Sequence, residues 1–144
     1  RLPVVFPVHP RTRRALEGRR WPQGRVWPLL TLPPVGYLEM LGLLRGARVV
    51  LTDSGGMQEE TTAEGIPCLT LRENTERPVT LEQGTNQLVG SDPDRILAAL
   101  DRILNAGGRV GRIPELWDGH ATERIREDLR QWAPLSVRQS TKLG

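Results

Sequence analysis

Two kinds of apolar pattern alternate along this chain. Short runs in which nearly every residue is apolar are typical of strands buried on both faces. Between them, apolar residues recur every three or four positions, as in amphipathic helices. The predicted strands are residues 2–8, 25–32, 48–52, 68–71 and 87–89. The predicted helices are residues 13–18, 36–45, 57–64, 92–104 and 120–132.

Glycine and proline mark the ends of several elements. Pro33 and Pro34 end the second strand because neither can donate a hydrogen bond to a sheet. Gly65 ends the third helix. Residues 72–84 are polar and are expected to form a loop. Residues 134–144 are also polar and are expected to form a disordered tail.

Strands that alternate with helices indicate an α/β fold. The connecting helices place the strands parallel and cover both faces of the sheet. In such sheets, ligands bind at the carboxyl ends of the strands. With 144 residues and 38% apolar content, one domain is the expectation. The chain starts with Arg1, not Met, and runs at once into an apolar strand, so we expect a fragment of a larger fold.

Composition narrows the classes of partner. Lys and Arg number 20 against 17 Asp and Glu, and no run of five or six like charges occurs, so a solvated surface explains the charge better than nucleic-acid binding. No apolar stretch of about 18 residues is present, so we expect no membrane partner. The single Cys68 lies in an apolar run without metal-ligand companions. It is expected to be a buried structural thiol, with no metal site.

Residues 53–60 read Asp-Ser-Gly-Gly-Met-Gln-Glu-Glu and lead from a predicted strand into a predicted helix. Free N–H groups and the helix dipole favour an anion there, and Gly55 and Gly56 let it approach the backbone. The Ser54 hydroxyl either caps the helix or binds a phosphate oxygen. Glu60 is unsuited to a phosphate but suited to the vicinal diol of a ribose. The alternative is a tight turn followed by surface acids.

A second polar block, residues 72–78, reads Arg-Glu-Asn-Thr-Glu-Arg-Pro and follows the next strand. Neighbouring parallel strands end at the same edge, so we expect two arginines and a hydroxyl to converge beside the Ser54 turn. A solvated charged loop is the alternative. His9 closes the first strand and is suited either to a phosphate or sugar hydroxyl or to a local cap. His120 has no companion at metal-ligand spacing and is expected to make only local contacts.

Both blocks resemble signature segments of the non-hydrolysing UDP-N-acetylglucosamine 2-epimerases, and the spacing between the blocks matches as well. The resemblance implies a glycosyltransferase-B-type fold of two Rossmann-like domains with the active site between them. Residues 1–133 would form the C-terminal, UDP-binding domain, and the N-terminal domain would be missing. Further similar segments cover essentially the whole chain: residues 7–10, 36–38, 82–90 and 113–119.

The resemblance also implies roles for single residues. Ser54, Gly55 and Gly56 would hold the diphosphate of UDP, Glu60 would accept the ribose hydroxyls, and Arg77 would lie at the diphosphate end.

Two further positions follow from the resemblance. Met40 stands where some members place an aromatic side chain beside the uracil. His9 matches a histidine near the bound sugar nucleotide, which in some members belongs to a second, regulatory site. His9 and Arg77 are the candidate catalytic residues.

The family reaction interconverts UDP-N-acetylglucosamine and UDP-N-acetylmannosamine by removing the C2 proton, eliminating UDP and adding it back. The acid and base carboxylates of the family come from the missing domain, so this chain alone is expected to be inactive. No cofactor is implied. The full-length protein would be a cytoplasmic, bacterial homodimer that serves cell-envelope polysaccharide synthesis.

Three alternatives remain open at this point. A related two-domain glycosyltransferase also binds UDP with its C-terminal domain, although the block at residues 72–78 argues against it. A non-enzymatic nucleotide-binding module would also explain a free-standing chain of this size. Nucleic-acid binding predicts an affinity that falls steeply with salt and does not need Glu60.

Overall fold

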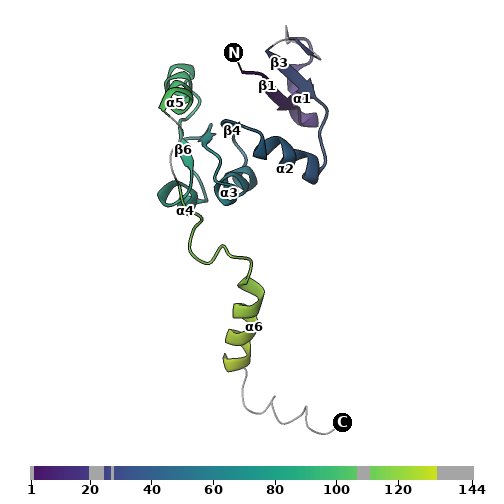
Figure 1. Ribbon diagram of the computed structural model, residues 1–144. Coiled ribbons are helices and arrows are strands. Elements are labelled where there is room, and N and C mark those ends of the chain that lie inside the picture. The colour runs from purple at the N-terminus through teal and green to yellow at the C-terminus, as the bar shows by residue number, and fades with distance from the viewer. Residues whose placement is uncertain (1, 20–24, 27, 107–110, 133–144) are drawn as a thin grey trace. The chain divides into compact units, whose positions relative to one another are not determined.

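The computed structural model describes residues 2–19, 25–26, 28–106 and 111–132, apart from the side chains of residues 25 and 26 (Figure 1). Within the chain, two compact units are distinguished, Arg1–Gly46 and Ala47–Gly144. The predicted domain of residues 1–133 stays a prediction. The predicted tail of residues 134–144 lies outside the described residues.

The first unit contains a small sheet and two helices. Its elements are β1 (Val4–Pro7), α1 (Pro10–Leu16), β2 (Arg25–Val26), β3 (Leu29–Leu32) and α2 (Tyr37–Arg45). β1 and β3 are parallel, with Val4 opposite Leu29, whereas β2 pairs antiparallel with β3. The single strand predicted at residues 25–32 is therefore wrong. Pro28 lies between β2 and β3 and cannot donate a ladder hydrogen bond, which fits a break there.

Both helices of the first unit begin at side-chain contacts. α1 starts at Pro10, earlier than predicted, because His9 is its N-cap and the His9 Nδ1 accepts the N–H of Arg11 at 3.2 Å. Proline suits the first helical position, where its missing N–H is not needed. α2 starts after Gly36, whose N–H donates to the Glu39 carboxylate at 2.7 Å. The helix predicted at residues 36–45 is confirmed.

The second unit is built on an all-parallel sheet of order β4-β5-β6. The predicted loop at residues 72–84 is wrong in part, because it contains the short helix α4. Pro78 at its first position favours this turn of helix. The elements of this unit are β4 (Val50–Thr52), α3 (Gly55–Ala63), β5 (Cys68–Thr70), α4 (Pro78–Glu82), β6 (Asn86–Leu88), α5 (Pro93–Ala106) and α6 (Ala121–Trp132).

Helices cover both faces of the central strand β5. Leu69 is fully buried and clusters with Val89 and with Ala99 and Ile103 of α5. Its neighbour Cys68 points to the opposite face, because side chains alternate along a strand. The Cys68 thiol contacts Thr61 of α3 there. Figure 1 shows α3 and α5 flanking the strands in this way. The predicted two-sided cover is therefore confirmed for this sheet.

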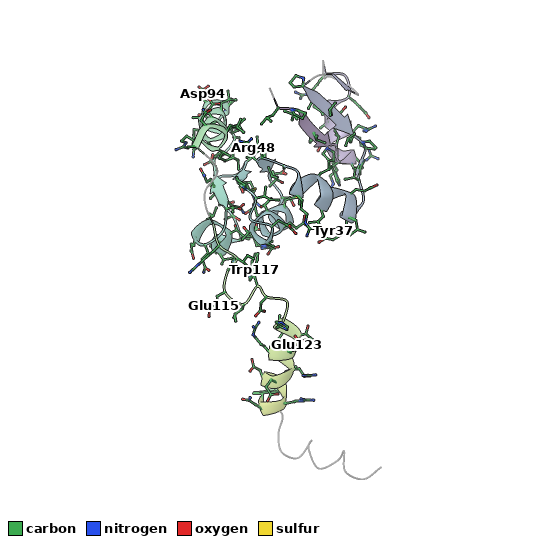
Figure 2. All side chains as sticks on the ribbon, in the orientation of Figure 1. Tyr37, Arg48, Asp94, Glu115, Trp117 and Glu123 are labelled. Carbon is green, nitrogen blue, oxygen red and sulfur yellow. The ribbon has the colours of Figure 1, made fainter. Side chains whose placement is uncertain are left out.

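The segment that leads to α6 carries Glu115 and Trp117, which Figure 2 labels. It begins against the end of α4, where the Arg112 N–H donates to Gln83 O at 2.8 Å. Asp118 accepts the N–H of His120 at 3.1 Å and pairs with Arg124 through both carboxylate oxygens. The Arg124 guanidinium, and then the His120 N–H, lower the pKa of Asp118.

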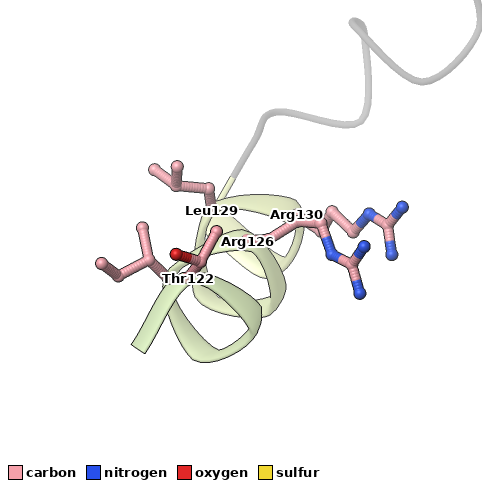
Figure 3. A pocket seen from close by; sticks show the side chains of 5 residues that line it. Thr122, Arg126, Leu129 and Arg130 are labelled. Carbon is pink, nitrogen blue, oxygen red and sulfur yellow. The ribbon is translucent and has the colours of Figure 1, made fainter. Parts of the chain in front are cut away.

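α6 has an exposed apolar side. Ile125 and Leu129 are each 58% exposed, and Trp132 is more exposed still. A shallow depression on this helix is lined by Thr122, Ile125, Arg126, Leu129 and Arg130, as Figure 3 shows. No helix in the described ranges is long and apolar enough to cross a membrane.

Gly84 is a position where any side chain would collide with its surroundings. A Cβ there would lie 2.6 Å from the carbonyl oxygen of Thr80 and also against the Thr62 side chain. We predict that Gly84→Ala lowers the free energy of unfolding by about 1–3 kcal/mol, because backbone must move. Urea denaturation followed by circular dichroism measures the change.

Gly42, in the middle of α2, is the matched control. A Cβ there meets nothing within 4 Å, so Gly42→Ala is expected to raise stability by about 0.5–1 kcal/mol through helix propensity. Equal effects of the two substitutions would contradict the packing at Gly84.

Cys68 is fully buried, as expected, and burial raises the pKa of its thiol, with Thr61 and Thr70 opposing the rise through hydrogen bonds. We predict that iodoacetamide at pH 8 modifies the native protein far more slowly than the urea-unfolded protein. The pKa of the Cys68 thiol is higher in the folded protein than in the unfolded protein. The free energy of unfolding should therefore fall as the pH rises above the ordinary thiol pKa. The chain has one cysteine, so mass spectrometry reports this thiol alone. Equal rates in both states would contradict the prediction.

Candidate functional site

The turn between β4 and α3 presents an open helix N-terminus. Ser54 is the N-cap in an extended conformation (φ −82°, ψ 130°), and its hydroxyl makes no capping hydrogen bond. The first turn of α3 contains no acidic residue. Its first N–H groups have no intrahelical partners, so the positive end of the helix dipole can receive an anion. Of the two roles open to the Ser54 hydroxyl, capping is not observed in this structure, and phosphate binding stays a prediction.

Gly55 and Gly56 keep this turn accessible to a ligand. A Cβ added at Gly56 would meet only the Ser54 hydroxyl, at 3.9 Å. A Cβ added at Gly55 would lie 3.9 Å from Cζ and Nη2 of Arg77. The guanidinium of Arg77 therefore stands over the first turn of α3. The prediction that the second polar block lies beside the Ser54 turn is confirmed.

The carboxylate of Glu59, on α3, holds the Arg77 side chain. Its Nε lies 2.7 Å from Oε1 of Glu59, within ion-pair distance although not aligned for a hydrogen bond. Both side chains are about 40% exposed, so solvent screening leaves such a pair worth about 0–1 kcal/mol. The Nη1 group donates to the carbonyl of Glu76 at 3.3 Å. These contacts leave Nη2 on the side of Gly55.

Arg72 does not join this site. Its Nη2 lies 3.3 Å from Glu76 Oε1 and 3.5 Å from Asn74 Oδ1, within its own loop. The expectation that two arginines converge beside the Ser54 turn is therefore wrong for Arg72. A carboxylate four residues away along the loop offers a nearer partner than the helix N-terminus. The hydroxyl of Thr75, in contrast, reaches α3 and donates to Gln58 Oε1 at 2.6 Å.

Glu60 lies on the second turn of α3 and is partly buried. Among the residues that the structure describes, its carboxylate has no ion-pair or hydrogen-bond partner. A half-buried carboxylate without a partner is free to accept hydrogen bonds from a ligand's hydroxyl groups. Glu59 and Glu60 thus differ, because Glu59 is engaged with Arg77 while Glu60 is not.

A buried polar layer fastens α3 to the sheet. Gln58, Thr61 and Asn86 are each 0% exposed. Asn86 Nδ2 on β6 donates to the backbone carbonyl of Gln58 at 3.1 Å, and Thr61 Oγ1 lies 3.2 Å from Asn86 Oδ1. Sequence reasoning assigned these residues no structural role. The available signal was the pair of polar positions at 58 and 61, three apart on the helix face that turns to the sheet.

The remaining predicted positions belong to the first unit. His9 caps α1 and is exposed, and Met40 lies partly buried on α2. The site that the structure itself assembles consists of residues 54–60 and 75–77 of the second unit. In the described part of the chain, no group of three or more His, Cys, Asp or Glu residues is arranged to hold a metal ion.

A parallel sheet covered by helices, with the N-terminus of α3 at the carboxyl end of its strands, defines an α/β protein of the Rossmann-like kind. The family model for UDP-N-acetylglucosamine 2-epimerase matches residues 1–130. This chain belongs to that family.

Individual relatives agree with this assignment. A UDP-N-acetylglucosamine 2-epimerase of Methanococcus maripaludis is 46% identical over 105 residues, which are 72% of this chain and 29% of that protein. The UDP-2,3-diacetamido-2,3-dideoxy-D-glucuronate 2-epimerase of Pseudomonas aeruginosa is 41% identical over 128 residues, covering 88% of this chain and 34% of the relative. The chain thus spans about a third of the length of these relatives.

A solved structure shows the same fold. The Methanocaldococcus jannaschii UDP-GlcNAc 2-epimerase, in complex with UDP-GlcNAc and UDP, matches with a TM-score of 0.69 and 35% identity. The match covers 90% of this chain and 36% of that one. The predicted Rossmann-like α/β fold of the glycosyltransferase-B type is confirmed by this likeness.

The buried layer under α3 yields a stability prediction. Asn86→Ala removes the donor to the Gln58 carbonyl and leaves that buried oxygen without this partner, so stability should fall by about 1–3 kcal/mol. Asn74→Ala, in the exposed loop, is the control and should change stability by less than about 0.5 kcal/mol. Thermal and urea unfolding of both variants measure the difference. A neutral Asn86→Ala would show that the layer does not fasten α3.

Proposed function

We propose that this chain binds the UDP part of a UDP-linked sugar, within a protein that acts as a UDP-N-acetylglucosamine 2-epimerase. The observation that carries the proposal is the open N-terminus of α3 with the Arg77 guanidinium over it. Backbone N–H groups and a cation that meet at one point match the charge of a diphosphate. In this proposal Ser54, Gly55 and Gly56 hold the diphosphate together with Arg77.

Glu60 and Met40 are proposed to bind the nucleoside. The Glu60 carboxylate, which has no partner within the described part of the chain, is suited to accept hydrogen bonds from the two ribose hydroxyls. Met40 is assigned to the uracil, where its polarizable sulfur can pack against a ring. His9 is assigned to the sugar nucleotide, either at the reacting sugar or at a second site.

The contribution of this chain to catalysis is electrostatic. Epimerisation by elimination and re-addition breaks the bond between C1 of the sugar and the UDP oxygen, so negative charge grows on the diphosphate. N–H groups and an arginine aimed at that charge bind the transition state more tightly than the ground state. We assign the removal and return of the C2 proton to groups outside this chain. The proposed protein interconverts UDP-N-acetylglucosamine and UDP-N-acetylmannosamine and requires no cofactor.

The finer setting is part of the same proposal. The protein is assigned to the bacterial cytoplasm, as a homodimer that supplies sugar for cell-envelope polysaccharides. A second candidate substrate class comes from the Pseudomonas aeruginosa relative, whose name gives a UDP-linked 2,3-diacetamido uronate. The two substrates share UDP and a 2-acetamido group, so the site at α3 suits either.

We predict that the folded chain binds UDP saturably and that Arg77→Ala and Glu60→Ala each weaken binding about 10- to 100-fold, as expected for charge-assisted hydrogen bonds. Arg77→Ala should spare uridine, which has no phosphate, whereas Glu60→Ala should weaken uridine and UDP alike. Isothermal titration calorimetry at two salt concentrations measures both ligands. A nucleic-acid site would instead lose affinity steeply with salt.

The matched controls carry the same charge changes on α6. Arg126 and Glu123 are both exposed and lie outside the proposed site. Arg126→Ala and Glu123→Ala should therefore leave the UDP affinity within about twofold of wild type, because such surface substitutions perturb a protein little. A folded wild-type chain that does not bind UDP would overturn the proposal for this chain. Equal losses in Arg77→Ala and Arg126→Ala would assign the effect to net charge and not to the site.

A further inference from the structure

Arg77 can act on a diphosphate only if its loop is fixed over α3, and the structure shows what fixes it. We propose that Thr75, acting through the buried amide of Gln58, is the positioning residue that holds Arg77 over the N-terminus of α3. This inference rests on the proposed UDP site. It adds residues that touch no ligand but set the geometry of the group that does.

The hydrogen bonds around Thr75 form a directed chain. The Arg77 N–H donates to Thr75 Oγ1 at 3.0 Å, and Thr75 Oγ1 lies 2.6 Å from Gln58 Oε1. An amide oxygen can only accept and an N–H can only donate, so the single hydroxyl proton must point to Gln58. Both the donor and an acceptor position of the hydroxyl are thereby used. No other orientation of the Thr75 hydroxyl satisfies both neighbours.

Gln58 is the buried anchor of this chain of hydrogen bonds. Its side chain is 0% exposed, and its Nε2 lies 3.4 Å from the carbonyl of Ser54, the N-cap of the helix. Its own backbone carbonyl accepts from Asn86 of β6. Water cannot easily replace a partner of a fully buried amide, so losing one is costly. The Thr75 hydroxyl therefore ties the loop to the same turn that carries Ser54.

The backbone of Arg77 is held on its other side as well. Its carbonyl accepts the hydroxyl of Thr80 at 2.7 Å and the Thr80 N–H at 3.0 Å, at the start of α4. Arg77 is thus the N-cap of α4. With the N–H held by Thr75 and the carbonyl by Thr80, the Cα of Arg77 has little freedom. Such preorganisation raises affinity because less motion is lost on binding.

The side chain of Arg77 depends on this backbone position. Glu59 holds Nε through a solvent-screened pair, which alone does not fix the guanidinium. If the loop shifts, Nη2 leaves its place beside Gly55 while the charge and the Glu59 pair remain. Losing the Thr75 hydroxyl should therefore weaken the contact of Arg77 with a diphosphate without removing the arginine.

The test compares Thr75→Val, which has nearly the same shape but no hydroxyl, with Thr75→Ser, which keeps the hydroxyl. The first readout is hydrogen exchange of the Arg77 backbone amide, measured by NMR without ligand. The second is the affinity for UDP and for uridine by calorimetry, in the wild-type and the Arg77→Ala background. Thr122→Val, the same chemical change at an exposed position of α6, is the control.

We expect Thr75→Val to speed exchange of the Arg77 amide about 10-fold and to weaken UDP binding about 3- to 10-fold, the range of one net hydrogen bond. Uridine affinity should not change, and Thr75→Ser should restore both readouts. In the Arg77→Ala background, Thr75→Val should have no further effect on UDP, because Thr75 acts only through Arg77. Thr122→Val should behave as wild type.

Each contrary outcome has one meaning. Unchanged Arg77 exchange in Thr75→Val overturns the inference, whatever happens to UDP. Faster exchange with unchanged UDP affinity also overturns it, provided that Arg77→Ala weakens UDP binding. An equal loss of UDP affinity in the Arg77→Ala background, or a loss of uridine binding, would show a general structural role for Thr75. If the folded wild type binds no UDP, the proposed function fails, and the inference fails with it.

Discussion

The site depends on the N-terminus of α3, because the first N–H groups of a helix lack intrahelical partners and, in the described structure, the Ser54 side chain does not cap this helix. β4 ends at Thr52, two residues before the Ser54 cap, so the chain turns directly from strand to helix. The parallel pairing of β4 and β5 then places the end of β5, and the loop after it, at the same sheet edge. The helix dipole and the charged loop become one site only through this topology.

A second constraint lies beneath that turn, where the face of α3 against the sheet is polar. Gln58 and Thr61 are fully buried there, and Asn86 of β6 forms hydrogen bonds with both. An apolar face would pack without directional contacts and would tolerate small rotations of the helix. Hydrogen bonds at defined positions make such rotations costly, since each buried group would lose its partner. The orientation of α3 is thereby specified along with its position.

The sequence predicts the elements whose signal is periodic and long. α5 is one, because Ile96, Ala99, Leu100 and Ile103 recur at helical spacing and belong to, or pack against, the core cluster around Leu69. The turn at Ser54 is predicted for a different reason, because its glycines and its place after a strand are local features. α4 was missed because its residues Pro78–Glu82 are too few to show a period. The hairpin of β2 and β3 was missed because it depends on pairing and not on apolar content.

The candidate site, too, has one part that the sequence predicts and one part that it does not. The convergence of residues 53–60 and 72–78 follows from the parallel pairing of β4 with β5, which sequence reasoning expected for successive strands. The pairing of strands does not determine which arginine faces α3. Arg72 and Arg77 are the same residue type in the same loop, and they differ in their ion-pair partners, Glu76 and Glu59. The hydroxyl of Thr75 decides between them by fixing the backbone at Arg77. Tertiary hydrogen bonds of this kind leave no periodic mark on a sequence.

The pair between Arg77 and Glu59 is compatible with anion binding for an energetic reason. Both groups are partly exposed, so separating them costs only about 0–1 kcal/mol. A diphosphate carries more negative charge than one carboxylate, and the backbone N–H groups of α3 can donate hydrogen bonds to it as well. Glu59 touches Nε, whereas Nη2 faces Gly55. Arg77 can therefore bind an anion while it still contacts Glu59, and the carboxylate helps to orient the guanidinium without blocking it.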